Sequence, residues 1–301
     1  MRKTTRFKEL VQAPELLVLP GVHDALSARV AEAAGFGALA AAGFGATGAL
    51  LGQPDSSQLS GNELADHYAR IGDAVDIPVF VDADTGFGNV TNVARTVGQF
   101  ERAGVAGLFI EDQVFPKRCG HTPGKDVVSV DAYIDKLKAA LDAREDPDFM
   151  IMARTDALGV HGIEEAIDRA RMFAEIGADM IFVEAPPDAD AMRRICTEVE
   201  GYHLANMVDF GDSPLLTAAE LEDIGYATAV WPVASVFTVV KALREMYGAL
   251  KRDGTTEAAQ GGMVDFKAYT DLVGLPELRD REEQYLQFAR DYLAAKRNAA
   301  E

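Results

Sequence analysis

The residues that decide the fold are Arg102-Ala-Gly-Val-Ala-Gly-Leu-Phe-Ile-Glu-Asp112. The stretch begins at the end of a helical pattern, turns at Gly104, and continues as a short apolar run that ends in two carboxylates. A glycine often caps the end of a helix, and an uninterrupted apolar run of this length is typical of a strand that is buried on both faces. The same order of helix, glycine and strand recurs at residues 33–38 and 175–179, which indicates a repeated unit.

Eight short apolar runs alternate with helical patterns along the chain. The predicted strands span residues 16–19, 37–41, 78–82, 107–110, 149–153, 180–183, 203–206 and 227–231. The predicted helices span residues 25–34, 61–75, 89–103, 130–145, 163–176, 189–199, 217–223 and 236–251. Because apolar strands that alternate with helices form parallel sheets, eight such units predict a closed (β/α)8 TIM barrel of the α/β class.

The barrel accounts for only part of the chain. Residues 1–251 are predicted to form the catalytic barrel domain, and residues 252–301 a helical extension of the same domain, since no linker-like segment separates them. The extension contains a charged helix over residues 280–296, with Asp280 predicted as its N-cap. This helix either packs on its own barrel or is contributed to a neighbouring subunit.

Composition narrows the class of function. The 301 residues carry a net charge of −19, which opposes binding to nucleic acid or to an anionic membrane. Cys119 and Cys196 are the only cysteines, so a disulfide scaffold is excluded and a reducing compartment is favoured. We find no signal-peptide pattern and no run near the ~20 apolar residues of a membrane span. A cytoplasmic protein is therefore expected.

A loop dense in reactive side chains follows the fourth predicted strand. It reads Glu111-Asp-Gln-Val-Phe-Pro-Lys-Arg-Cys-Gly-His-Thr-Pro-Gly-Lys125. Its prolines and glycines exclude a regular helix or strand. The loop places Cys119 beside Lys117, Arg118 and His121, and neighbouring cations activate a thiol for proton transfer. The loop is therefore predicted to be the lid of an active site.

Polar residues stand at the ends of five consecutive predicted strands, where barrel enzymes place their catalytic groups. They are Asp82 and Asp84, Glu111 and Asp112, Arg154, Glu184, and Asn206. Clustered carboxylates repel one another unless a cation lies among them, and hard oxygen ligands favour Mg²⁺, or Mn²⁺, over zinc.

Arg154 is predicted to bind a substrate carboxylate in bidentate fashion through its guanidinium. Asn206 is predicted to donate a hydrogen bond to the same carboxylate. Alternatively, Arg154 forms a structural ion pair with Asp156 or Glu184. The alternative for Asn206 is a core amide whose hydrogen bonds are all made within the protein.

The motifs resemble those of the isocitrate lyase/phosphoenolpyruvate mutase superfamily, from about residue 6 to at least residue 254. The resemblance rests on Leu-Gly-Gln-Pro-Asp55, Asp-Ala-Asp-Thr-Gly-Phe-Gly88, Glu-Asp-Gln-Val-Phe-Pro-Lys-Arg-Cys-Gly-His121, Ala-Arg-Thr-Asp156, Val-Glu-Ala185 and Ala-Asn-Met207. Within the superfamily, the chain looks most like the branch that holds methylisocitrate lyases, 2,3-dimethylmalate lyases, petal-death lyases and carboxyphosphonoenolpyruvate mutases.

The resemblance implies a Mg²⁺-dependent barrel enzyme that acts on a small α-hydroxy or α-keto di- or tricarboxylate. It implies that Asp84 binds the metal directly, and that Asp82, Glu111 and Asp55 hold the metal's waters. The residues implied or predicted to bind the substrate are Gly43, Phe44, Asp55, Gly120, Arg154, Glu184 and Asn206. Gly43 and Phe44 would act through their backbone N–H groups.

The resemblance also implies how the loop works. Lys117, Arg118, Cys119, Gly120 and His121 match a mobile gating loop, and in the lyase branch the cysteine is the general acid. The expected catalytic set is Glu111 together with Lys117, Arg118, Cys119 and His121. Members of the superfamily are commonly homotetramers that swap C-terminal helices between subunits, which favours the swapped position of residues 252–301.

The expected activity is Mg²⁺-dependent carbon–carbon bond cleavage of a 2-hydroxy acid of the 2-methylisocitrate or 2-alkylmalate type. Ala42 replaces the usual serine or threonine of this group, and Phe44 stands where a small residue or tyrosine is common. Both changes favour a smaller or more apolar substrate. The alternatives are a carboxyphosphonoenolpyruvate mutase, an oxaloacetate hydrolase or decarboxylase, and a protein that binds a metabolite without catalysis.

Overall fold

The computed structural model describes residues 1–118, 120 and 124–299. The chain forms two compact units, Met1–Val240 and Lys241–Glu301. They divide within helix α11 (Ala234–Asp253), whereas the sequence placed the end of the barrel domain near the far end of that helix. The boundary after residue 251 stays a prediction.

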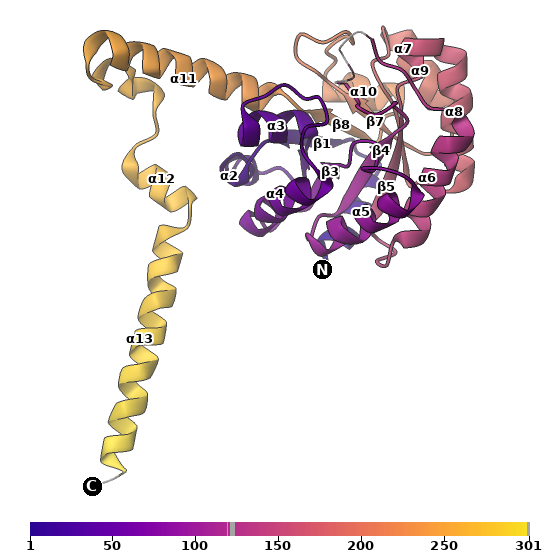
Figure 1. The fold of residues 1–301 in the computed structure, drawn as a ribbon. Coiled ribbons are helices and arrows are strands. Elements are labelled where there is room, and N and C mark those ends of the chain that lie inside the picture. The colour runs from indigo at the N-terminus through magenta and orange to yellow at the C-terminus, as the bar shows by residue number, and fades with distance from the viewer. Residues whose placement is uncertain (119, 121–123, 300–301) are drawn as a thin grey trace. The chain divides into compact units, whose positions relative to one another are not determined.

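The first unit contains a closed barrel of eight parallel strands in sequential order, with β8 paired to β1 (Figure 1). The strands are β1 (Leu17–Val22), β2 (Leu39–Ala41), β3 (Val79–Asp82), β4 (Gly107–Glu111), β5 (Met150–Thr155), β6 (Met180–Val183), β7 (Tyr202–Asn206) and β8 (Thr228–Trp231). All eight predicted strands overlap with these, and the predicted TIM barrel is confirmed.

Strand β1 continues through Pro20 and Gly21, where the sequence had indicated its end. The glycine is required there because a Cβ on Gly21 would lie 2.5 Å from the backbone of Pro232, which follows β8. This close approach of two backbones is a tertiary contact that no local pattern reveals.

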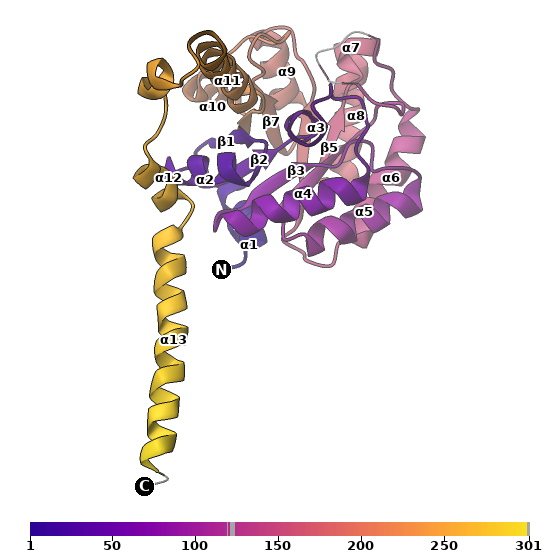
Figure 2. The same cartoon turned by 60° about the vertical axis from the view of Figure 1, so that its left-hand side comes forward.

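Helices surround the barrel, and Figure 2 shows α4 and α5 side by side outside β3. The helices of the first unit before α11 are α1 (Lys3–Val11), α2 (Ala25–Ala33), α3 (Gly43–Leu51), α4 (Gly61–Ala74), α5 (Val90–Arg102), α6 (Val130–Ala143), α7 (Leu158–His161), α8 (Ile163–Ile176), α9 (Ala189–Glu198) and α10 (Ala218–Ile224). Capping boxes begin four of them, at Asp24, Ser60, Asn89 and Thr217. These local signals explain why the predicted starts of these four helices agree with the structure to within one residue.

Three of these helices, α1, α3 and α7, had no prediction. Helix α1 buries Phe7 and Val11 completely, and the Phe7 ring stacks on Phe80 of β3 at 5.2 Å between centroids. Its apolar residues therefore join the barrel core. Helix α3 contains Gly43, Gly45 and Gly48, which have poor intrinsic helix propensity, so its formation depends on tertiary packing.

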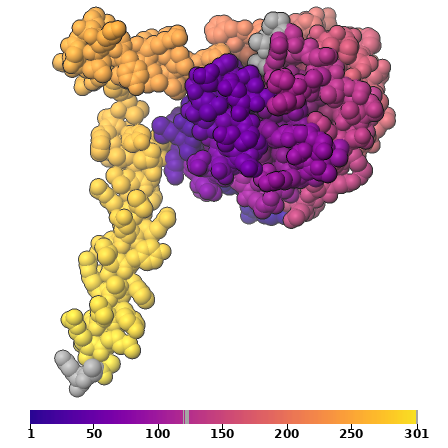
Figure 3. All heavy atoms as spheres, in the orientation of Figure 1, coloured from indigo at the N-terminus to yellow at the C-terminus, as the bar shows by residue number. Residues whose placement is uncertain are grey.

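The second unit contains the rest of α11, the short 3₁₀ helix η1 (Glu257–Gly262), α12 (Phe266–Leu272) and α13 (Leu275–Asn298). The predicted helix of residues 280–296 lies within α13, but Gly274, and not Asp280, is its N-cap. Pro276 in the first turn suits this earlier start, since a proline there sacrifices no helical hydrogen bond. No residue of α13 is buried, and Figure 3 shows its side chains standing along its length.

No helix in the described part of the chain is both long enough and apolar enough to span a membrane.

Candidate active site

The carboxyl ends of the strands surround a cavity of about 350 Å³. Its floor is the apolar top of the barrel core, which includes Phe80, Phe109 and Phe182. The predicted site residues that line it are Phe44, Asp55, Asp82, Lys117, Gly120, Arg154, Glu184 and Asn206. Parallel strands deliver side chains from distant parts of the sequence to this one face.

The first cluster in the site gathers carboxylates around Lys117. The Lys117 ammonium lies 2.9 Å from Asp55 Oδ2, 2.9 Å from Asp84 Oδ1 and 4.0 Å from Asp82 Oδ2. Asp82 Oδ2 also accepts from the Gly43 N–H at 3.0 Å, and Asp82 Oδ1 accepts from the Asp84 N–H at 2.8 Å. The structure thus brings together five residues that sequence reasoning had selected separately.

Backbone geometry positions this cluster. Asp84 has a φ of 47°, in the left-handed region that is costly for a residue with a side chain. A Cβ at Gly43 would lie 3.1 Å from Asp82 Oδ2 and 3.4 Å from Asp84 Oδ1, so a larger residue there would crowd the Asp82 carboxylate. Gly43 is therefore suited to the close approach of the α3 backbone to the acidic cluster.

Burial and like charge perturb the titration of the cluster. Burial raises the pKa of Asp84 to about 7, with Lys117 opposing the rise and Asp82 adding to it. Burial likewise raises the pKa of Glu111 well above its ordinary value, although Arg154 opposes this. Burial alone would lower the pKa of Lys117, but the surrounding carboxylates raise it well above its ordinary value. These carboxylates therefore require positive charge nearby to stay ionised.

The donor set suits a hard cation that keeps its waters. Asp84 Oδ1 and both carboxylate oxygens of Glu111 are buried without a hydrogen-bond partner, although Lys117 and Arg154 lie within ion-pair distance. Among the described residues, no three His, Cys, Asp or Glu side chains converge to hold a metal ion directly. A cation with one or two direct carboxylate ligands and several waters fits both observations.

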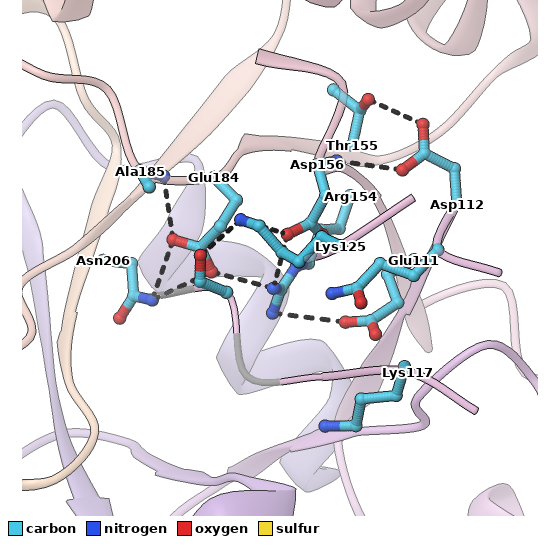
Figure 4. A network of polar contacts seen from close by, with 12 residues as sticks. Glu111, Asp112, Lys117, Lys125, Arg154, Thr155, Asp156, Glu184, Ala185 and Asn206 are labelled. Atoms are coloured by element: carbon cyan, nitrogen blue, oxygen red, sulfur yellow. Dashed lines mark hydrogen bonds and ion pairs between the residues drawn. The ribbon is translucent and has the colours of Figure 1, made fainter. Parts of the chain in front are cut away.

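The second cluster is centred on Arg154 (Figure 4). Arg154 donates two hydrogen bonds to Asp156, from Nε to Oδ2 at 2.9 Å and from Nη2 to Oδ1 at 3.2 Å. It also pairs with Glu184 Oε2 at 2.9 Å and Glu111 Oε2 at 3.3 Å. The ion pairs weighed as an alternative are thus present, and Arg154 still lines the cavity.

Asn206 and Glu184 are joined directly. The Asn206 amide nitrogen lies 3.3 and 3.2 Å from the two carboxylate oxygens of Glu184, and Asn206 Oδ1 is buried without a hydrogen-bond partner. Glu184 also accepts from the Ala185 N–H at 2.8 Å. Asn206 is therefore held in place by Glu184 and is not fully satisfied within the described residues.

Part of the predicted gating loop lies against these clusters. Gly120 lines the cavity, and a Cβ there would lie 2.4 Å from Glu184 Oε2. Lys125 donates to the Gly120 carbonyl and pairs with Asp156 at 3.1 Å. The Arg118 N–H and carbonyl bond to the Gln113 side chain at 2.9 Å each. Cys119 and His121 lie outside the described residues.

Two residues next to the site, Lys125 and Asp112, have roles that the sequence did not predict. Lys125 was noted only as the end of the loop, yet it links the loop to the end of β5. Asp112 was grouped with the residues at the mouth, but its carboxylate accepts from Thr155, from the Asp156 N–H and from Arg169. Asp112 does not line the cavity, and its hydrogen bonds with Thr155 and Asp156 hold the end of β5 in place.

Apolar residues on the far side of the cavity were missed altogether. They are Val208, Phe210, Val233 and Phe237, which follow β7 and β8. Phe44 lies edge-on to Phe237, with ring centroids 6.0 Å apart. The sequence prediction rested on polar residues at the strand ends, whereas Phe210 and Phe237 lie just beyond the ends of β7 and β8 and were the available signal.

Comparisons with known proteins agree with this geometry. The family model described as phosphoenolpyruvate phosphomutase matches residues 7–251. The chain is 45% identical to 2,3-dimethylmalate lyase of Eubacterium barkeri, over 95% of this chain and 99% of that one. It is 38% identical to 2-methylisocitrate lyase of Aeropyrum pernix, over 97% and 94% of the two chains. A solved structure of oxaloacetate acetylhydrolase superposes with a TM-score of 0.90 at 34% identity, over 94% and 97% of the two chains.

Proposed function

Because the chain belongs to the phosphoenolpyruvate phosphomutase family, we propose that it is a Mg²⁺-dependent carbon–carbon lyase. Its substrate is a 2-hydroxy di- or tricarboxylate of the 2-alkylmalate or 2-methylisocitrate type, which it cleaves into a 2-oxo acid and a carboxylate. The observation that carries the proposal is the meeting of the Lys117 carboxylate cluster and the Arg154 cluster in one cavity. Relatives with named lyase activities support it.

In this proposal Asp84 binds Mg²⁺, for which Mn²⁺ can substitute, and Asp82, Asp55 and Glu111 accept hydrogen bonds from its waters. The oxygen-only donors and the unpartnered oxygens of Asp84 and Glu111 support this assignment. When bound, the ion would supply Lewis-acid chemistry that makes the 2-hydroxyl of the substrate more acidic.

The chain's own residues bind and orient the substrate. Gly43 and Phe44 begin α3, and their backbone N–H groups bind a substrate carboxylate in this proposal. The Gly43 N–H, which donates to Asp82 at 3.0 Å, would exchange that partner for the substrate. Arg154 and Asn206 contact the remaining polar groups of the substrate, and Glu184 holds both in place. The Lys117 ammonium offsets part of the negative charge of the acidic cluster through its ion pairs with Asp55 and Asp84.

Bond cleavage follows transfer of the hydroxyl proton to a carboxylate of the site, which we assign to Glu111 because its two oxygens are buried without a hydrogen-bond partner. The C2–C3 bond breaks as the hydroxyl carbon becomes a carbonyl, and its electron pair moves to C3, giving an enediolate of the departing carboxylate. Cys119 delivers a proton to C3, a step that a positioned general acid accelerates by about 10²–10⁴-fold. Arg118 and His121 complete the gating loop that excludes water. The adjacent Gly120 lines the cavity, which supports this role for the loop.

The test is release of 2-oxo acid, coupled to lactate dehydrogenase, from 2,3-dimethylmalate, 2-methylisocitrate, isocitrate and other 2-alkylmalates. We expect Mg²⁺-dependent release that collapses in Cys119→Ser and persists in Cys196→Ser. Cys196 is a matched control because it lies on α9 and does not line the cavity. If no 2-oxo acid is released from any of these hydroxy acids in the presence of Mg²⁺, the lyase proposal is refuted.

A second candidate is hydrolysis of oxaloacetate, which the similarity to oxaloacetate acetylhydrolase favours. Formation of oxalate and acetate from oxaloacetate, followed by mass spectrometry, would identify it. A carboxyphosphonoenolpyruvate mutase remains the third option, and a phosphonate substrate in the same panel tests it.

The proposed assembly is a homotetramer, a dimer of dimers, in which C-terminal helices are exchanged between subunits. Support comes from α13, none of whose residues is buried within one chain although several are large and apolar. They include Leu278, Tyr285, Leu286, Phe288, Tyr292 and Leu293.

A further inference from the structure

Three phenylalanines from separate elements meet on one side of the cavity and form what we call the aromatic wall. Phe44 comes from α3, Phe210 from the segment after β7, and Phe237 from the start of α11. The Phe237 ring lies 6.0 Å from Phe44 and 6.5 Å from Phe210 between centroids, and all three residues line the cavity. Val208 and Val233 extend the same apolar surface.

The wall is apolar but open. Phe210 is 97% exposed and Phe237 38% exposed, so both rings present apolar surface that a bound ligand would cover. Covering such surface is favourable only for an apolar group, because a charged group placed there would lose its water without gaining a partner.

Charge reinforces this selectivity. Among the described residues that line the cavity, the cations are Lys117 and Arg154, and both are engaged by carboxylates. Asp209 also lines the cavity, beside Phe210 in the chain, and its Oδ2 is buried without a hydrogen-bond partner. A ligand carboxylate directed at this side would meet no described counter-charge and would be repelled by Asp209.

We infer that the aromatic wall determines specificity: it takes an alkyl substituent on C3 of the substrate and disfavours a third carboxylate at that position. Dialkylmalates are thereby selected over tricarboxylates, and the departing fragment is a short fatty acid such as propionate in preference to succinate. The inference rests on the proposed lyase function and assigns Phe44, Phe210 and Phe237, with Asp209, to the choice of substrate.

The kinetic test compares kcat/KM for 2,3-dimethylmalate and 2-methylisocitrate, which differ at C3 by a methyl against a carboxymethyl group. We expect the wild type to favour the dimethylmalate by about 10-fold or more, because apolar pockets already discriminate a single methylene by about that factor and the carboxymethyl group also carries a charge. Phe237→Ala should reduce the ratio, and Phe237→Arg, which adds a cation, should reduce it further or reverse it. Tyr202→Arg is the control, since Tyr202 is 37% exposed and does not line the cavity.

A binding measurement separates this inference from the lyase proposal. Methylsuccinate and tricarballylate carry the same methyl and carboxymethyl difference but have no hydroxyl to activate. Calorimetry with Mg²⁺ present should show tighter binding of methylsuccinate to the wild type and a smaller difference in Phe237→Ala.

The outcomes are distinguishable. If no hydroxy acid is cleaved but methylsuccinate still binds more tightly in a Phe237-dependent way, the lyase proposal fails and the wall keeps its role. If cleavage occurs while tricarboxylates are preferred, or while the Phe237 variants leave the ratio unchanged, the wall does not determine specificity and the inference is overturned.

Discussion

At the scale of the residue, the site is governed by carboxylates that are buried beside one another. Asp82, Asp84 and Asp55 surround one ammonium group, and each is almost completely shielded from water. Burial penalises ionisation of Asp84 and raises its pKa, whereas Lys117 favours the ionised form. The charge state of the site is therefore a property of the folded chain.

The raised pKa of Asp84 predicts a specific dependence of stability on pH. The folded-state pKa of about 7 lies above the ordinary value of 3.8, so between these values the folded protein holds a proton that the unfolded chain has lost. This contribution to stability is complete below about pH 4 and disappears as the pH rises through about 7. Relative to wild type, Asp84→Asn should gain on the order of 4 kcal/mol across that range, because each unit of pKa shift corresponds to about 1.4 kcal/mol.

Urea denaturation at several pH values, with EDTA present, measures this difference. Asp223→Asn is the matched control, because the Asp223 side chain is 77% exposed. A difference in unfolding free energy between Asp84→Asn and wild type that stays constant from pH 4 to pH 7 would contradict the raised pKa.

Gly120 predicts a second effect of a single residue. In Gly120→Ala the new Cβ would meet Glu184 within 2.4–2.6 Å, and Glu184 cannot easily yield because Arg154 and Asn206 hold it. We expect kcat/KM to fall by about 10²-fold, as displacements of about 1 Å at reacting groups do, with little change in melting temperature. Gly48→Ala is the control, since a Cβ there meets nothing within 4 Å. Equal activity of the two variants would show that the loop does not press on Glu184.

At the scale of the element, the barrel closes where β1 meets β8. Leu17 to Pro20 pair in register with Thr228 to Trp231. Just beyond this ladder, Gly21 faces the backbone of Pro232, which lines the cavity. The close approach of the Gly21 and Pro232 backbones therefore lies both at the closure of the barrel and at the rim of the cavity.

Gly21→Ala should strain that closure. The added methyl would lie 2.5 Å from the Pro232 backbone, which cannot rotate away as a side chain would, so we expect a loss of about 1–3 kcal/mol in unfolding free energy. Gly37→Ala is the matched control, two residues before β2, where the nearest atom is a Leu10 methyl at 3.7 Å. Chemical denaturation of both variants checks this, and equal stabilities would contradict it.

At the scale of the whole molecule, no described residue of the second unit belongs to the hydrophobic core clusters. No residue of α12 or α13 is buried, and large apolar side chains are spaced along α13. An apolar helix face of this kind is stable in water only when another surface covers it.

We predict that the full chain sediments at about four times its 32.3 kDa mass, and that Leu286→Glu together with Phe288→Glu lowers the mass. Gln284→Glu with Gln287→Glu on the same helix adds the same charge and is the control. A wild-type protein that sediments as a monomer would contradict the proposed tetramer. Sedimentation equilibrium measures all three.

The sequence by itself determined the barrel, because its strands and capping boxes are local patterns in which apolar runs and helix starts lie within a few residues. It also indicated the acidic and basic strand ends, because parallel topology sends every such end to one face. It could not place Lys117 among the carboxylates, assign the pairs of Arg154, find α1 and α3, or reveal the aromatic wall. Those features depend on contacts between residues distant in sequence, and only the tertiary structure decides which groups lose water together.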